Sequence, residues 1–327
     1  MQHPILVPLD GSPTAEDALP MAAALARRRR APIELVLVRE PAADPMTIHG
    51  SVTAIRTRDE SERAAALHYL GSVAERLRAG GVTDVRTNVV DSEVVSAIRT
   101  RAEQGRALLI AMCTHGRGGW SRFWLGSVAQ ELIRRVQFPL LLTRPHGADD
   151  ELATPPSPHG PSRVLVTLDG SVFAERALDA AVSTFGTQNV EYTLLRIVRS
   201  GAVDGHGGSM TPPDPAVEEA RRDHAAQYLD AVAERLREDG ITTRPVTLAR
   251  RHVAAAIAEY AVESVMDVIA IATHARRGMP RLIVGSVADK VLRASPVPVL
   301  MYRPPVDEAE PVDEPDTPAI AIPPIGA

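Results

Sequence analysis

The chain repeats itself at a constant offset, and this constrains its fold more than any other feature. Four segments recur 159 positions further on: Val7–Ser12 as Val166–Ser171, Val73–Arg78 as Val232–Arg237, Thr114-His115 as Thr273-His274, and Gly126–Ala129 as Gly285–Ala288. Chance similarity would not keep one offset across four segments. The 327 residues therefore contain two tandem copies of one domain.

Composition marks the segments that lie outside the two copies. Residues 146–161 combine proline and glycine with acidic residues, which is typical of a linker. Residues 305–327 are also rich in proline and acidic side chains, and we expect them to form a disordered tail. The expected domains are thus residues 1–145 and 162–304.

Short apolar runs alternate with helical stripes inside each copy. In the first copy the expected strands are Ile5–Leu9, Ile33–Val38, Val85–Val89, Ala107–Met112 and Phe138–Thr143. Ser12 can cap the first helix, with Pro13 at its first position, and we expect a kink at Pro20. Further helices are expected around 66–77, around 94–102 and from Ser127. Pro245 in the second copy is tolerable only in an edge strand. Five strands alternating with four helices predict an α/β fold with a mostly parallel, doubly wound sheet.

Charge and composition exclude several classes of partner. The net charge of −5 and an aromatic content of 3% argue against nucleic-acid binding. No run approaches the roughly 20 apolar residues that cross a bilayer, and no secretory signal precedes Ile5. We therefore expect a cytoplasmic protein with no membrane contact. The single cysteine, Cys113, excludes an internal disulfide, and the sequence suggests no metal site.

Two loops carry the residues best suited to bind a ligand. In an open α/β sheet, ligands bind beyond the carboxyl ends of the strands. Asp10 follows the first strand, where its carboxylate can accept hydrogen bonds, although it could instead only cap the next helix. The glycine-rich segment 114–119 leads to Gly126-Ser127, where a helix N-terminus can receive an anion. The alternative is a surface loop with a serine cap.

These residues together resemble the universal stress protein family, in a tandem form. That family carries the signature Gly-x2-Gly-x9-Gly-Ser/Thr. Cys113 to Gly116, followed by nine residues and Gly126-Ser127, matches it except at Cys113. In the second copy Ala272 and Ala275 replace both early glycines, while Gly285-Ser286 keeps the spacing.

The resemblance implies an adenine nucleotide alpha hydrolase-like fold, with strand order 3-2-1-4-5 in each domain and ATP bound at strands one and four, together with Mg²⁺. The implied nucleotide-binding residues are Pro8, Leu9, Asp10, Val38, Met112, Cys113, Gly116, Arg117, Gly126, Ser127 and Val128. A weaker second site would use Thr167, Leu168, Asp169, Ile197, Ile271, Gly285, Ser286 and Val287. Gly116 has the counterpart Ala275, whose Cβ restricts the backbone, so we expect tighter ATP binding in the first copy.

The family resemblance implies an ATP-binding regulator of the stress response that is not an enzyme beyond weak hydrolysis. A scaffold that dimerises without nucleotide is the alternative, and the altered glycines of the second copy favour it there. An adenylating enzyme of the related ATP-pyrophosphatase group is a third reading. That group uses a Ser-Gly-Gly-x-Asp-Ser loop, which Asp10–Pro13 does not match.

The last strand of each copy is apolar, although order 3-2-1-4-5 leaves it at a sheet edge. The apolar residues are Leu140, Leu141 and Leu142 in the first copy and Val299, Leu300 and Met301 in the second. An unprotected apolar edge invites pairing. We therefore expect self-association through these strands, either between the two copies as a pseudo-dimer or between two chains.

Overall fold

The secondary structure repeats in the two halves of the chain. The computed structural model describes residues 3–40, 52–114, 125–145, 157, 159–200, 214–273 and 285–305. Repeat one contains β1 (Ile5–Leu9), α1 (Pro13–Glu16), α2 (Leu19–Arg29), β2 (Ile33–Arg39), α3 (Val52–Ala79), β3 (Val85–Asp91), α4 (Val94–Gly105), β4 (Leu109–Cys113), α5 (Ser127–Arg135) and β5 (Leu140–Thr143). Repeat two contains β6 (Arg163–Thr167), α6 (Val172–Phe185), β7 (Glu191–Arg199), α7 (Pro215–Glu238), β8 (Thr242–Arg250), α8 (Val253–Glu263), β9 (Val268–Ala272), α9 (Ser286–Ala294) and β10 (Val299–Tyr302).

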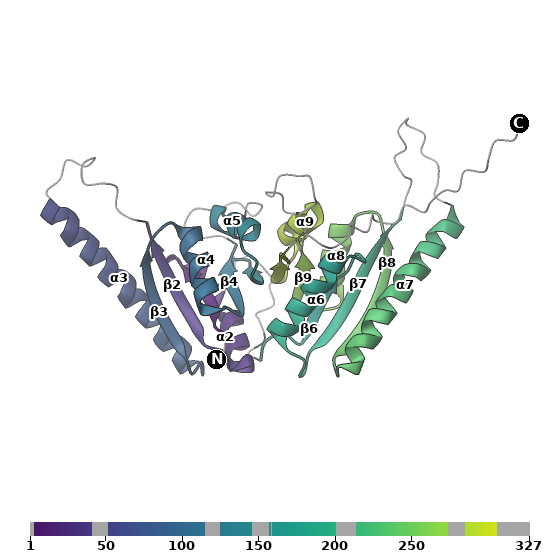
Figure 1. Ribbon diagram of the computed structural model, residues 1–327, viewed down its shortest axis with the longest axis horizontal. Coiled ribbons are helices and arrows are strands. Elements are labelled where there is room, and N and C mark those ends of the chain that lie inside the picture. The colour runs from purple at the N-terminus through teal and green to yellow at the C-terminus, as the bar shows by residue number, and fades with distance from the viewer. Residues whose placement is uncertain are drawn as a thin grey trace, which may run out of the picture.

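All ten strands form one sheet, in the order β3-β2-β1-β4-β5-β10-β9-β6-β7-β8. Each half therefore has the order 3-2-1-4-5, and every pair of strands within a half is parallel. The two halves lie side by side, with the long helices α3 and α7 at the outer ends (Figure 1). The expected α/β architecture with two tandem parallel sheets is confirmed. None of the described helices is long and apolar enough to cross a membrane.

The two halves join through their fifth strands. β5 and β10 pair antiparallel, with Leu142 opposite Val299, Leu141 opposite Leu300, and Leu140 opposite Met301. The apolar edges thus cover each other within one chain, which is the pseudo-dimer form of the expected pairing. Association between two chains stays a prediction.

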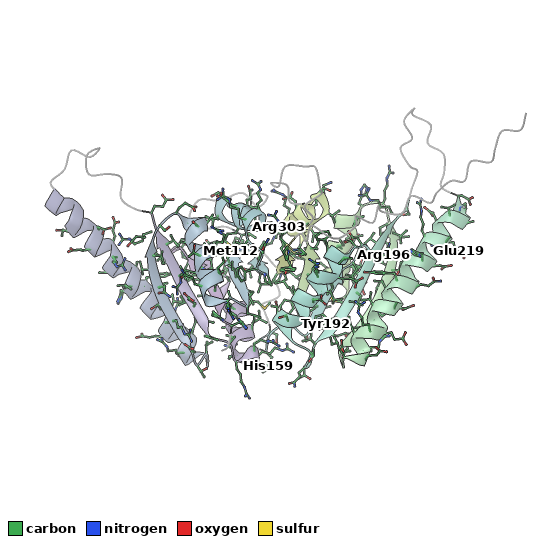
Figure 2. The ribbon with its side chains drawn as sticks, viewed as in Figure 1. Met112, His159, Tyr192, Arg196, Glu219 and Arg303 are labelled. Atoms are coloured by element: carbon green, nitrogen blue, oxygen red, sulfur yellow. The ribbon has the colours of Figure 1, made fainter. Side chains whose placement is uncertain are left out.

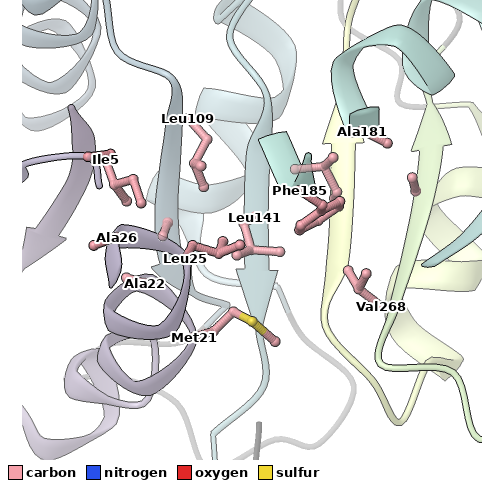
Figure 3. Packing of buried hydrophobic residues seen from close by; sticks show 14 of the residues in the cluster. Ile5, Met21, Ala22, Leu25, Ala26, Leu109, Leu141, Ala181, Phe185 and Val268 are labelled. Atoms are coloured by element: carbon pink, nitrogen blue, oxygen red, sulfur yellow. The ribbon is translucent and has the colours of Figure 1, made fainter. Parts of the chain in front are cut away.

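Alternate residues along the strands feed two apolar layers, one on each side of the sheet. One layer contains Leu141 and Leu300 with the helices α2, α3, α6 and α7. The other contains the neighbouring strand residues, such as Leu140 and Met301, with α4, α5, α8 and α9. Figure 3 shows the first layer where it passes from Leu25 of α2 through Leu141 to Phe185 of α6. Each layer runs through both repeats, so the halves share a core.

The first helix of repeat one is interrupted, which corrects the expected kink at Pro20 and the expected count of four helices. α1 ends at Glu16, and α2 begins at Leu19 with Pro20 in its first turn. Proline lacks the N–H that would continue the helix and fits only a first turn. Its counterpart in repeat two is Asp179, and there α6 runs unbroken as one of the four helices expected.

Two local predictions hold. Ser12 accepts a hydrogen bond from the N–H of Ala15 and caps α1, with Pro13 at the first position. Pro245 lies in β8, which ends the sheet order and is therefore an edge strand. An edge strand tolerates proline, which has no N–H to donate to a ladder, because it has a strand neighbour on one side only.

Arg28 connects the end of α2 to repeat two. Its Nη1 donates to the carbonyl of Pro161 at 2.6 Å, and its Nη2 donates to the carbonyl of Gln188. Burial lowers the pKa of this guanidinium. Beside it, the hydroxyl of Tyr192 donates to the carbonyl of Gly186 at 2.6 Å. The two bonds of Arg28 therefore tie α2 of repeat one to repeat two.

Candidate functional site

The turn after β1 holds the Asp10 carboxylate in a defined position. Oδ1 of Asp10 accepts from the backbone N–H of Ser12 at 2.9 Å and from the Ser12 hydroxyl at 2.6 Å. Ser12 in turn accepts from Ala15 at 3.2 Å, so the serine caps the helix and the aspartate orients the serine. Gly11 makes this turn at a φ of 83°, a region that favours glycine. A half-buried carboxylate is thereby presented at the carboxyl end of β1.

Repeat two builds the same turn after β6. Oδ1 of Asp169 accepts from the N–H and hydroxyl of Ser171 at 3.0 and 2.6 Å, and Gly170 has a φ of 91°. Asp169 is more exposed than Asp10. The duplicated Asp-Gly-Ser sequence therefore gives duplicated geometry.

The second part of the repeat-one site is the start of α5. The N–H of Gly126 donates to the carbonyl of Thr114 at 2.8 Å, and the N–H of Thr114 donates to Thr143 at 2.8 Å. These bonds hold the helix start against the end of β4. Gly126 is the N-cap and provides no side-chain acceptor to the first turn. The first N–H groups of a helix attract anions when nothing caps them.

The corresponding helix start in repeat two is held differently. Thr273 donates to Tyr302 at 2.9 Å, as Thr114 does to Thr143, and Gly285 is the N-cap of α9. Between the described residues Gly285 and Thr273, however, there is no bond like the one that joins Gly126 to Thr114. The α5 start is therefore tied more closely to its sheet than the α9 start.

The remaining repeat-one residues lie along the same edge. β1 lies between β2 and β4, so the end of β1 is flanked by Val38 on one side and by Met112 and Cys113 on the other. Met112 and Cys113 are buried, Val38 and Val128 are half-buried, and Ser127 is exposed. Pro8 and Leu9 form the last two register pairs of β1 with β2. The expected site residues that are described thus share one edge, whereas Gly116 and Arg117 lie outside the described residues.

The repeat-two residues occupy matching places. Thr167 ends β6 and Leu168 follows it, Ile197 lies near the end of β7, and Ile271 lies near the end of β9. Ser286 is exposed and Val287 is half-buried at the start of α9. Ala275 lies outside the described residues, so its effect on the loop stays a prediction.

A glutamate, a tyrosine and an arginine beside each Asp-Gly-Ser turn were missed by the sequence reasoning. In repeat one, Tyr69 donates to Oε1 of Glu16 at 2.9 Å, and Arg76 lies 2.7 Å from Oε2. Burial, the bond to Glu16 and the nearby charge of Asp10 raise the pKa of Tyr69. Repeat two contains the same trio, 159 positions later, as Glu175, Tyr228 and Arg235. The constant offset was the signal that could have found it.

Repeat two differs at its turn because a cation covers it. The guanidinium of Arg196 lies 5.1 Å from the ring centre of Tyr228. A side chain at Gly170 would meet its Nη2 at 3.1 Å, so the guanidinium packs on the turn itself. The counterpart of Arg196 is Leu37, which is buried in the apolar layer. The two turns are therefore equal in backbone but unequal in charge.

Comparison with known proteins accounts for this duplicated arrangement. The sequence profile described as the Universal stress protein family matches residues 1–144 and again residues 161–303. The chain belongs to the universal stress protein family. A universal stress protein of Mycobacterium tuberculosis is 27% identical over 310 residues, which span 92% of this chain and 97% of the relative.

Two further universal stress proteins match the chain, one over a single repeat and the other over both. One from Bacillus subtilis is 28% identical over 147 residues and aligns over 99% of its own length with 43% of this chain. The crystal structure of a universal stress protein from Archaeoglobus fulgidus superposes with a TM-score of 0.65 and 20% identity, covering 92% of this chain and 98% of the other. The tandem fold is thus found in a solved member of the universal stress protein family.

Proposed function

We propose that this universal stress protein is a cytoplasmic regulator that binds ATP in repeat one. The observation that carries the proposal is the repeat-one edge, where the fixed carboxylate of Asp10 and the start of α5 lie at the ends of neighbouring strands. A carboxylate suits ribose hydroxyls, and a helix start without a side-chain cap suits phosphate. Both groups are needed to bind a nucleotide along this edge.

Repeat two is proposed to bind ATP more weakly or not at all. Its turn carries the Arg196 guanidinium on Gly170, and its α9 start lacks the bond that Gly126 makes in repeat one. Ligand groups at this second edge would therefore meet a different charge and a less constrained helix start. Mg²⁺ is proposed to enter with the nucleotide, held by phosphate oxygens, which are the ligands that this ion prefers.

Isothermal titration of the full chain with ATP, AMP, GTP and cyclic AMP in the presence of Mg²⁺ tests the proposal. One molecule of ATP per chain, bound more tightly than GTP, would support it. Two equal ATP sites would contradict the difference between repeats. Absence of binding for all four nucleotides would favour the alternative function, a scaffold that acts through its paired repeats. Phosphate release from bound ATP, measured in the same samples, tests the proposal that hydrolysis is at most weak.

A further inference from the structure

The last residue pair of the β7–β8 ladder brings two like charges together. In repeat one the last pair of the β2–β3 ladder is Arg39 opposite Asp91, and Nε of Arg39 lies 3.1 Å from Oδ1 of Asp91. In repeat two the last pair is Arg199 opposite Arg250. Like charges directly opposite each other destabilise a sheet. The arginine pair therefore does not stabilise the sheet.

The connection that follows reverses its charge in the same way. α4 and α8 begin 159 positions apart, at Val94 and Val253. The three residues before α4 are Asp91-Ser92-Glu93, and the three before α8 are Arg250-Arg251-His252. Glu93 caps α4 by accepting from two backbone N–H groups at 2.9 and 2.7 Å, whereas His252 makes no side-chain cap bond to α8.

Arg199, Arg250, Arg251 and His252 are all exposed, and we call them the basic edge. Within the described parts of the chain, none of the three arginines forms an ion pair with a carboxylate; Arg250 donates to the carbonyl of Ala249 at 3.0 Å. Three positive side chains thus lie near the carboxyl ends of β7 and β8, with no acidic partner among the residues that the structure describes. Such a surface fits an acidic peptide.

The course of the chain after β10 points to the occupant. β10, β9, β6, β7 and β8 are parallel neighbours in that order, so β10 ends at the same side of the sheet as the basic edge. The carbonyl of Pro305 accepts from Nη1 of Arg176 at 2.9 Å, and Arg176 belongs to α6, which follows β6. The chain after β10 is therefore held against α6 of repeat two. Figure 2 shows Arg303, just after β10, and Arg196 of β7 both nearer the upper side than Tyr192, which lies at the start of β7.

We propose that the acidic segment 306–316 of this chain binds the basic edge of repeat two. The segment contains six carboxylates: Asp307, Glu308, Glu310, Asp313, Glu314 and Asp316. From β10 to β8 is four strand spacings, or about 19 Å, and an extended chain covers about 3.3 Å per residue. About six residues after Pro305 therefore span that distance, so Asp313, Glu314 and Asp316 can reach the arginines. The interaction is specific to repeat two, because the matching edge of repeat one is acidic.

A fluorescein-labelled peptide of residues 305–327 tests the proposal on full-length proteins. The first protein is native, and the second carries the neutral tail D307N, E308Q, E310Q, D313N, E314Q and D316N. The third adds the repeat-one residues Arg250→Asp, Arg251→Ser and His252→Glu to the neutral tail. A peptide with the same six amides is the control ligand. Fluorescence anisotropy measures binding at about 20 mM and about 300 mM salt, because screening weakens exposed charge pairs.

The neutral-tail protein is expected to bind the acidic peptide at low salt, and the native protein at least about tenfold more weakly, because an attached tail competes at high effective concentration. The third protein is expected to lose about tenfold relative to the second. Equal binding by the native and neutral-tail proteins, retained binding by the third, or equal binding of the amide peptide would each overturn the proposal. Circular dichroism checks that each variant folds. If the triple variant does not fold, Arg251→Glu alone in the neutral-tail protein replaces it, with an expected loss of about threefold in affinity for the acidic peptide.

Discussion

The hydroxyl of Tyr69 donates to Oε1 of Glu16 at 2.9 Å and thereby joins the long helix α3 to α1, next to the turn that holds Asp10. Arg76 occupies the other oxygen of the same carboxylate at 2.7 Å. Because α1 begins directly after the Asp-Gly-Ser turn, this bond anchors that turn to the long outer helix α3. Tyr228 and Glu175 do the same in repeat two at 3.0 Å.

Removing the Tyr69 hydroxyl should destabilise the protein modestly. We expect Tyr69→Phe to lower the free energy of unfolding by about 0.5–1.5 kcal/mol, the usual net worth of one hydrogen bond. Urea denaturation followed by circular dichroism measures this change. Tyr228→Phe is the matched variant of repeat two and should cost about the same, because Tyr228 donates to Glu175 as Tyr69 does to Glu16. An unchanged unfolding midpoint in Tyr69→Phe would show that water replaces the bond without loss.

Removing the Asp10 carboxylate should abolish most ATP binding. Asp10→Ala deletes the group proposed to bind ribose and leaves Ser12 without the acceptor that orients it. Asp169→Ala deletes the same bonds in repeat two, but it should change ATP affinity little. Titration calorimetry on both variants compares them, and their melting temperatures separate binding from folding. Loss of ATP binding on the Asp169 change alone would contradict the assignment of the tighter site to repeat one.

A charge at the centre of the sheet should separate the two repeats. Leu141 is fully buried and lies opposite Leu300. Leu141→Lys places an ammonium in the shared apolar layer, where no partner awaits it, at a cost of several kcal/mol. We expect a large fall in melting temperature by calorimetry. Leu67→Lys, at a side chain that is 48% exposed, is the control and should have little effect. If Leu141→Lys lowers the melting temperature no more than Leu67→Lys does, the β5–β10 junction does not stabilise the chain.

Tyr192 should make the protein less stable in alkali. Burial raises the pKa of its hydroxyl, which donates to Gly186. The folded state therefore keeps this proton above pH ~10, where an unfolded tyrosine loses it. Stability from this group is complete below pH ~10 and falls as the pH rises, by up to ~1.4 kcal/mol per pH unit.

The variant Tyr192→Phe removes that titration. Urea unfolding at pH 8, 10 and 11 should show the native protein losing its advantage over Tyr192→Phe as the pH rises. A constant difference in unfolding free energy between the two proteins across this range would exclude Tyr192 as a source of the pH dependence.

Most of the fold could be predicted from local patterns. Ile5–Leu9 is a strand in both sequence and structure, and Ser12 caps the helix as its type and position indicate. Pro245 marks an edge strand because a proline nitrogen cannot donate to a ladder. The interruption of the first helix was less accurately placed, because it begins before Pro20 at Asp17 rather than at the proline.

The candidate site was predicted only where it follows the repeated motifs. The Asp10 turn and the Gly126 helix start were found because sequence spacing marks the ends of strands and the starts of helices. The trio of Glu16, Tyr69 and Arg76 was not found, because its members are up to 60 positions apart. Only packing of α3 beside α1 brings them together.

The sequence by itself determined that this protein is two copies of one α/β domain, since the 159-residue offset and the alternating periodicity are properties of the chain alone. Tertiary structure decided how the copies meet, because an apolar strand such as Leu140–Thr143 can pair with any open edge. It also decided the charge of each edge: Arg199 and Arg250 are 51 positions apart and become neighbours only through the register of β7 with β8. Electrostatic and hydrogen-bonding partners depend on distance in space, and the fold alone sets that distance.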